Sequence, residues 1–245
     1  MTEMNYAGYI DFSSIEWPDH TSSVLFFRGC KAGCFYCYNK HILAGDNYVS
    51  LDVIKDKING SKPFVEAIVM SGGECTEQPD ALYELLKYTK SIGLKTGLYT
   101  NGCNPDIIFV LLKENLIDMI SLDIKATWEN YPSLTAIKDT SSIKKSLSLC
   151  IMASRTNKLE YFNVNTTVFK SNLSDIFGID LYLPSDINQT ITKGIIKPES
   201  GECVSDEEFM YAIKEYTDPY ILTRPVTVKM ANQIHKYFPC SDAAM

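Results

Sequence analysis

The chain of 245 residues lacks any long apolar run, because none approaches the roughly 18 residues that a membrane-spanning helix needs. Its opening residues have neither the basic start nor the apolar stretch of a signal peptide, so we expect a cytoplasmic protein. The chain also lacks an excess of basic residues. With 23 Lys and Arg against 30 Asp and Glu its net charge is −7, which argues against broad binding to nucleic acid or to a membrane surface.

Cysteine is sparse as well, since 8 residues in 245 are too few for a disulfide scaffold. Three of them nevertheless lie in one short segment, RGCKAGCFYCYN, as Cys30, Cys34 and Cys37 with the spacing C-x3-C-x2-C. Chance would give this spacing about 0.01 times in such a chain. Thiolates bind iron–sulfur clusters, and three of them leave one iron open to an exchangeable ligand.

Two other interpretations of these cysteines are three small buried side chains and part of a zinc site. Both are disfavoured, because no fourth Cys or His follows at zinc spacing and a loop bounded by Gly29 and Gly33 is a poor core element.

Short apolar segments alternate with helical patterns along the chain. We predict strands at 23–29, 64–73, 94–102, 117–125, 160–169 and 189–198, and helices at 50–58, 79–93, 105–115 and 139–154. Ser50 is a candidate N-cap, and Pro79 and Gly93 bound the second helix. The alternation of six strands with helices indicates an α/β fold with one parallel sheet, closed or partly closed as a barrel, with a flat doubly wound sheet as the alternative.

A second motif, Ser71-Gly72-Gly73-Glu74, ends the second predicted strand. Glycine pairs let backbone approach a ligand closely, and a carboxylate can bind an ammonium group. Alone the motif also fits a tight strand-to-helix turn. Because it lies one unit after the cysteines, both motifs would share the carboxyl edge of the sheet, and the joint chance expectation is on the order of 10⁻⁴.

Together the two motifs resemble those of the radical S-adenosylmethionine (SAM) superfamily, and the resemblance covers most of the chain. It implies a partial (β/α)6 TIM-type barrel and a [4Fe–4S] cluster bound by the three cysteines, with SAM completing the fourth iron. It also implies a set of SAM contacts: the methionine amino group at Gly72, Gly73 and Glu74, and the adenine near Tyr36.

Further matches resemble glycyl-radical-enzyme activating proteins, especially those of anaerobic ribonucleotide reductase. They are EWPDHTSSVLFFRGC, Asn39, LYTNG with Thr100 and Asn101, and SLDIKA with Asp123 and Lys125. The resemblance implies that Asp123 and Lys125 orient the ribose and carboxylate of SAM and that Asn165 contacts the carboxylate. Each position also has a purely structural interpretation. Asp123 and Lys125 would lie at a surface strand end, Thr100 and Asn101 would form a turn before Gly102, and Asn165 would be a paired strand amide.

The implied activity is reductive cleavage of SAM to a 5′-deoxyadenosyl radical that abstracts hydrogen from a glycine of a partner enzyme. A flavodoxin or ferredoxin is the expected electron donor. Two alternatives remain: a radical enzyme acting on a small biosynthetic molecule, such as a deazapurine precursor, and an iron–sulfur electron carrier. The carrier would leave the Gly72–Glu74 motif unexplained.

The chain departs from the activating-protein pattern at Cys75, where proline is usual, at Tyr38, and at FKSN (169–172). We expect Cys75 to be an inert buried thiol rather than a reactive one. Cys103 and Cys150 are expected in the core, and with Cys203 and Cys240 they form no second cluster motif. We predict a single domain over 1–245, with an N-terminal extension (1–22), a barrel core (23–200) and a C-terminal cover or partner segment (201–245).

Overall fold

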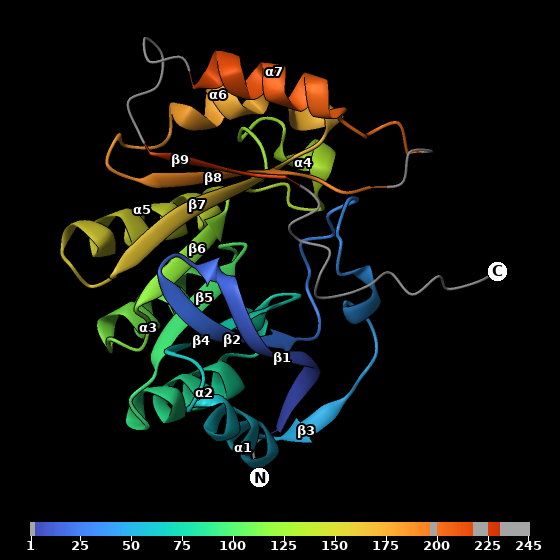
Figure 1. Cartoon of the computed structure of the whole chain (residues 1–245). Coiled ribbons are helices and arrows are strands. Elements are labelled where there is room, and N and C mark those ends of the chain that lie inside the picture. Colours follow the sequence, from blue (N-terminus) through green and yellow to red (C-terminus); the bar gives the residue numbers. More distant parts are fainter. Residues whose placement is uncertain (1–2, 197–199, 218–224, 231–245) are drawn as a thin grey trace. The chain divides into compact units, whose positions relative to one another are not determined.

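A computed structural model describes residues 3–196, 200–217 and 225–230. Within these ranges nine strands form one sheet in the order β3-β1-β2-β4-β5-β6-β7-β8-β9 (Figure 1). Strands β2, β4, β5 and β6 run parallel to one another, as do β8 and β9, whereas β1 is antiparallel to β2 and β3. The predicted α/β class with a mostly parallel sheet is confirmed, and the described sheet is not closed into a barrel.

The strands are β1 Glu3–Trp17, β2 His20–Phe27, β3 Tyr48–Ser50, β4 Ala67–Gly72, β5 Lys95–Thr100, β6 Met119–Asp123, β7 Tyr161–Val168, β8 Asn188–Lys193 and β9 Val226–Lys229. The α-helices are α1 Leu51–Ser61, α2 Pro79–Ser91, α3 Pro105–Lys113, α4 Tyr131–Leu134, α5 Ser141–Arg155, α6 Asp175–Asp180 and α7 Asp206–Tyr216. Short 3-10 helices are η1 Lys40–Ile42, η2 Cys75–Glu77 and η3 Lys170–Asn172.

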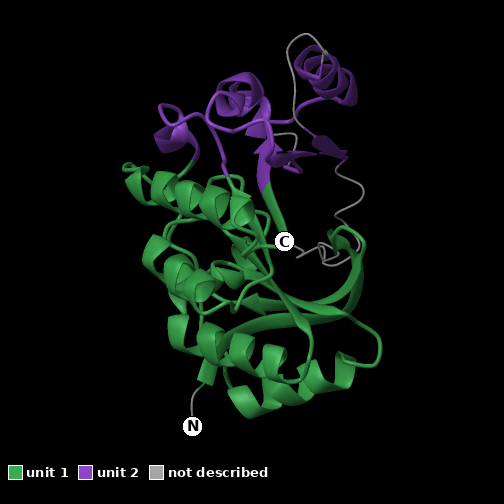
Figure 2. Ribbon diagram, turned by 90° about the vertical axis from the view of Figure 1, so that its left-hand side faces the viewer, with its two compact units in different colours: residues 1–123, 135–163 green, residues 124–134, 164–245 purple. Residues whose placement is uncertain are grey.

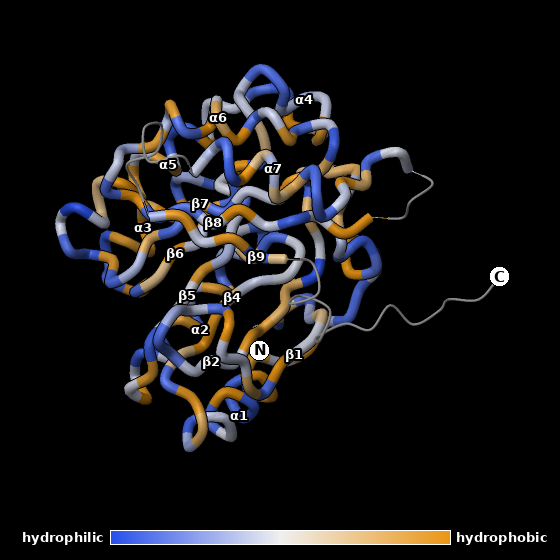
Figure 3. Tube along the Cα trace, turned by 45° about the horizontal axis from the view of Figure 1, so that its top comes forward, coloured by the Kyte–Doolittle hydropathy of each residue, from blue (hydrophilic) through white to orange (hydrophobic). Residues whose placement is uncertain are grey.

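Local signals explain the elements that the sequence predicted. The Ser50 hydroxyl caps α1 by accepting a hydrogen bond from the Asp52 amide at 3.3 Å. Pro79 occupies the first turn of α2, where its missing N–H costs nothing. All six predicted strands and four predicted helices are present, with ends shifted by a few residues. Hydrophobic residues dominate β4 and alternate with polar ones along α2 (Figure 3).

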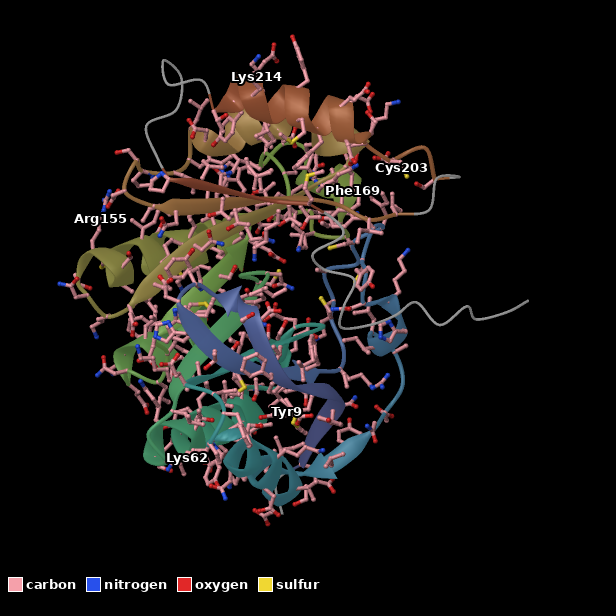
Figure 4. The ribbon with its side chains drawn as sticks, viewed as in Figure 1. Tyr9, Lys62, Arg155, Phe169, Cys203 and Lys214 are labelled. Atoms are coloured by element: carbon pink, nitrogen blue, oxygen red, sulfur yellow. The ribbon has the colours of Figure 1, made fainter. Side chains whose placement is uncertain are left out.

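The chain divides into two compact units (Figure 2). Unit 1 comprises residues 1–123 and 135–163 and contains the strands from β1 to β6. The region that we expected to be an N-terminal extension forms β1, which pairs with β2 through several register shifts. Tyr9 on β1 (Figure 4) shares a hydrogen bond of 3.0 Å with Ser61 at the end of α1, so this strand is integrated into unit 1.

Unit 2 comprises residues 124–134 and 164–245. Helices α6 and α7 lie on one side of β8 and β9 (Figure 1). An apolar cluster joins these elements, with buried members that include Val168, Ile191, Phe209 and Tyr216. Of the predicted cover segment, α7 and β9 are described, while Cys240 and His235 lie outside the described residues. Among the described helices of the chain, none combines the length and apolar character needed to cross a membrane.

Candidate active site

The three cysteines lie on the irregular segment between β2 and β3, at the carboxyl end of β2. Cys30, Cys34 and Cys37 are half-buried and carry thiols rather than disulfides. A tight turn joins the last two, because the Cys37 amide donates to the Cys34 carbonyl at 3.2 Å. Around Cys30 the Ala32 amide reaches the sulfur at 3.5 Å. Amide hydrogen bonds of this kind favour the thiolate, which is the form that binds iron.

Glycines allow this cysteine loop to pack closely against its surroundings. Gly33 has φ of +59°, and a Cβ there would lie 2.7 Å from the Cβ of Ala136. At the same point the Ala136 amide donates to the Ala32 carbonyl at 2.8 Å. Any side chain at residue 33 would therefore strain the backbone and displace this contact.

The Gly72-Gly73 pair is required by an approach of backbone to backbone. Cβ atoms on these residues would lie 2.2 Å from the carbonyl oxygen of Phe27 and 2.0 Å from that of Gly29, respectively. The Gly73 amide donates to the Phe27 carbonyl and the Glu74 amide to the Gly29 carbonyl, both at 2.8 Å. The Gly-Gly-Glu segment and the start of the cysteine loop are thus one hydrogen-bonded unit.

Two residues that the sequence analysis did not select also hold the cysteine loop. Glu77 accepts a hydrogen bond from the Lys31 amide at 2.8 Å. Gln78 donates to the Arg28 carbonyl at 3.0 Å and pairs with the backbone of Asn5 on β1. These partners are 46 to 73 residues apart in sequence. The only available signal was their position directly after the Gly-Gly-Glu motif.

The carboxylate of Glu74 is buried, with only 1% of the residue exposed. Its Oε1 accepts from the Thr76 amide (3.1 Å), the Thr76 hydroxyl (2.5 Å) and the Thr100 hydroxyl (2.8 Å), and its Oε2 accepts from the Asn101 amide (2.7 Å). Burial raises the pKa of Glu74 above its usual value, and these hydrogen bonds oppose the rise. All four donors are neutral, so the charge has no cationic partner among them.

Thr100 and Asn101, at the end of β5, therefore belong to the same cluster as Glu74. Asn101 is buried, with 6% of the residue exposed. Its Nδ2 lies 3.5 Å from the Cys30 sulfur, and its Oδ1 accepts from the Cys103 amide at 2.9 Å. The ends of β2, β4 and β5 are thus joined through three residues that the sequence had selected, namely Cys30, Glu74 and Asn101.

The remaining predicted contacts are more dispersed. Tyr36 is buried, with its ring edge-on to Phe35 at 5.2 Å. Asp123 ends β6, where its charge contributes to raising the pKa of buried Tyr99, after burial itself, Glu16 and Tyr161.

Lys125 and Asn165 belong to unit 2. The Lys125 carbonyl accepts from the Asn172 side chain at 2.7 Å, and Asn165 Oδ1 accepts from the Thr192 hydroxyl at 3.1 Å. The Asn165 side chain is therefore paired with a neighbouring strand, as its structural interpretation describes.

The other described cysteines have separate environments. Cys75 is fully buried and its thiol donates to the Tyr99 carbonyl at 3.6 Å. Burial, followed by the charge of Glu74, raises the pKa of Cys75 well above its usual value, as expected for an inert thiol. Cys150 is buried as predicted, whereas Cys103 is only half-buried because it lies on the loop after β5 rather than in the core. Cys203 is exposed before α7 (Figure 4).

Among the residues that the structure describes, no three His, Cys, Asp or Glu side chains gather as ligands of a single metal ion. An iron–sulfur cluster makes a different demand on its ligands, because each thiolate binds a different iron.

Comparisons with known proteins identify relatives of this chain. A profile of the Radical SAM superfamily matches residues 24–176. A Methanocaldococcus jannaschii protein named as a glycyl-radical enzyme activating enzyme is 28% identical over 88% of this chain and 94% of its own length. The pyruvate formate-lyase-activating enzyme of Clostridium pasteurianum is 32% identical over 42% of this chain and 45% of its own length.

Among solved structures, QueE from Escherichia coli superposes with a TM-score of 0.54 over 93% of this chain and 94% of that one, at 13% identity. This likeness concerns the fold alone. The profile match covers more than half of the chain, from β2 to α6, and therefore includes both motifs. Members of the superfamily use a [4Fe–4S] cluster together with SAM. The chain belongs to the radical SAM superfamily and is an enzyme of that type.

Proposed function

We propose that this chain is an activating enzyme that cleaves SAM reductively and abstracts hydrogen from a glycine of a partner glycyl radical enzyme, such as anaerobic ribonucleotide reductase. The observation that carries the proposal is the hydrogen-bonded junction of the cysteine loop, the Gly72–Glu74 segment and Asn101. The class of partner, a glycyl radical enzyme, is supported by the relative from M. jannaschii, because that match extends over 88% of this chain and 94% of the relative. Anaerobic ribonucleotide reductase is proposed as the example because LYTNG and SLDIKA resemble its activating proteins.

The residues present fit a cluster. Cys30, Cys34 and Cys37 share one loop, and two N–H groups, from Ala32 and Asn101, point at the Cys30 sulfur. The loop is anchored on several sides by backbone contacts, so its sulfurs are preorganised. When bound, the reduced cluster supplies the electron that splits a carbon–sulfur bond of SAM and yields a 5′-deoxyadenosyl radical.

The charge at the carboxyl end of the parallel strands suits a cationic cosubstrate. SAM carries a sulfonium and an ammonium group, and Glu74 places a buried negative charge among neutral donors. A buried charge without a counter-ion favours the binding of a nearby cation. We assign the amino group of SAM to the Gly72–Glu74 segment. Its remaining contacts are assigned to Tyr36, Thr100, Asn101, Asp123, Lys125 and Asn165.

The test is anaerobic. The cluster is reconstituted, dithionite and SAM are added, and 5′-deoxyadenosine is measured by chromatography, with and without a candidate glycyl radical enzyme. We expect 5′-deoxyadenosine and a glycyl radical signal in the partner by electron paramagnetic resonance. Cys34→Ala is the matched control and should give neither. An iron-replete wild-type protein that leaves SAM intact would contradict the proposal.

A radical enzyme for a small biosynthetic molecule is the second candidate. The full-length superposition with QueE favours it only at the level of fold, because identity is 13%. Formation of 5′-deoxyadenosine without any radical in candidate partners would move the assignment to this class. For the electron donor we propose a flavodoxin or a ferredoxin, and for the location the cytoplasm. Each donor can be tested by substituting it for dithionite in the same assay.

A further inference from the structure

Asn101 uses both ends of its side-chain amide. Oδ1 accepts a hydrogen bond from the Cys103 amide at 2.9 Å, which fixes which end of the group faces the cysteine loop. Nδ2 then points at the Cys30 sulfur at 3.5 Å, a normal length for an N–H···S hydrogen bond. Because Asn101 is only 6% exposed, solvent competes little for this contact.

Glu74 holds the backbone on which Asn101 is mounted. Its Oε2 accepts from the Asn101 amide at 2.7 Å, while its Oε1 accepts from Thr100, the preceding residue, at 2.8 Å. The Thr100 hydroxyl in turn accepts from the Gly102 amide at 3.1 Å. One buried carboxylate therefore fixes the turn after β5 to the end of β4.

We propose that Asn101 sets the reduction potential of the cluster by donating an N–H···S hydrogen bond to Cys30, and that Glu74 is the positioning residue that aims Asn101. The inference rests on the proposed function, because it requires Cys30 to bind an iron. Reduction adds negative charge to the cluster and its sulfurs, so a hydrogen bond to a ligand sulfur stabilises the reduced form more than the oxidised form. The contact therefore raises the potential and eases electron entry.

A role of Asn101 confined to binding SAM predicts something different. Replacing Asn101 would then weaken SAM binding and leave the potential of the SAM-free cluster unchanged. The potential without SAM therefore separates the two roles, and it is independent of turnover and of any partner protein.

The experiment is a redox titration of the reconstituted full chain without SAM, followed by electron paramagnetic resonance. Asn101→Leu removes the donor at nearly constant volume. We expect the ratio of reduced to oxidised cluster at a fixed potential to fall about tenfold, which is about 59 mV for a one-electron couple. Asn104→Leu is the matched control, because the Asn104 amide donates to the Thr76 hydroxyl at 2.9 Å instead of to a sulfur. Its potential should equal that of the wild type.

Asn101→Asp serves if the leucine variant does not hold iron. It keeps an acceptor for the Cys103 amide but turns an oxygen toward the sulfur, so the potential should fall at least as far. An unchanged potential in either iron-replete Asn101 variant would overturn the proposal.

Glu74→Gln tests the positioning role. Its amide oxygen would face the three donors at Oε1, leaving an NH2 group against the Asn101 amide. We expect a shift in the same direction as for Asn101→Leu but smaller. Thr76→Val removes another donor to the same carboxylate without touching Asn101, and it should leave the potential unchanged. Equal shifts in Glu74→Gln and Thr76→Val would overturn the assignment of Glu74.

The outcomes also separate this inference from the proposed function. If no iron–sulfur cluster forms in the wild type, the proposed function fails. If the cluster forms and SAM is cleaved, but the reduction potential is the same in the Asn101 variants as in the wild type, only the inference fails.

Discussion

The two ends of the parallel strands in unit 1 carry charge in different ways. At the carboxyl end, Glu74 is buried and bonded to neutral donors only. At the amino end, Lys95 pairs with Glu160 at 2.7 Å, and the two side chains are 39% and 45% exposed. His20 joins this pair, lying 2.7 Å from the Lys95 amine.

The difference separates stability from function. A paired charge at the surface loses little hydration free energy on folding and contributes little to stability. A buried carboxylate without a counter-ion is costly to desolvate, and Glu74 offsets that cost through the four hydrogen bonds that it accepts. Glu74 is therefore expected to be retained for what it positions and attracts, and the variants below test this contrast in order of expected effect.

The largest effect is expected from the thiols. Cys30→Ala, Cys34→Ala or Cys37→Ala should each abolish stable cluster binding, because two thiolates cannot replace the three-point attachment. Iron and sulfide content after anaerobic reconstitution measures this. Cys203→Ala, at an exposed thiol of unit 2, is the control and should bind iron as the wild type does. Iron-replete, fully active protein with all three loop cysteines replaced would end the assignment.

Glu74→Ala should be the next most severe change. It leaves four donors near the ends of β4 and β5 without their acceptor, and each unsatisfied buried group costs about 1–3 kcal/mol. We expect the unfolding free energy of the cluster-free protein to fall by about 3 kcal/mol or more in urea titrations. Cluster content should persist, while SAM affinity measured by calorimetry should fall about tenfold or more. Unaltered SAM affinity in a folded variant would place the cationic ligand elsewhere.

Glu74 also predicts the sign of a pH effect. Burial raises the folded-state pKa of Glu74 above its unfolded value. At a pH between these two pKa values, the folded protein therefore binds the proton more tightly than the unfolded protein does. Its contribution to stability is complete below the unfolded pKa and declines as the pH rises through the folded pKa. The unfolding free energy of the cluster-free wild type should therefore fall as the pH rises through this range, relative to that of Glu74→Gln. The opposite slope would mean that the hydrogen bonds outweigh burial.

Gln78 tests whether the cysteine loop depends on its anchors. Gln78→Leu removes three hydrogen bonds to the backbone of Asn5 and Arg28, worth about 2 kcal/mol together. The loss should appear in the unfolding free energy and as slower cluster reconstitution. Gln78→Glu should behave similarly, because a carboxylate cannot donate to the two carbonyl groups. A loss below about 0.5 kcal/mol in both variants would show that the loop is held by other contacts.

The sequence predicted the parts of this site that have a local signal. The cysteine spacing, the Gly-Gly-Glu motif and Asn101 could all be selected from short segments. The six strands and four helices that were predicted also followed from local periodicity and caps, whereas the short elements β3, α4 and α6 were not predicted. Strand β1 was missed because its mixture of polar residues, Gly8 and register shifts hides any alternation.

Contacts over long separations could not be predicted. The sequence suggested a ligand contact for Glu74, but its burial and its bonds to Thr100 and Asn101 appear only when β4 and β5 are brought together. That Gly72 and Gly73 admit a ligand stays a prediction, and the structure adds that they admit the backbone of Phe27 and Gly29.

The smallest effect is expected at the amino end of the strands. Glu160→Gln removes the charge that faces Lys95 and His20, and exposed ion pairs contribute about 0–1 kcal/mol. The unfolding free energy should fall by less than about 1 kcal/mol, and less still at high salt, where the pair is already screened. Cluster content, reduction potential and SAM affinity should all match the wild type. A drop comparable to that of Glu74→Ala would erase the contrast, because it would show that an exposed pair and a buried, unpaired carboxylate stabilise this sheet equally.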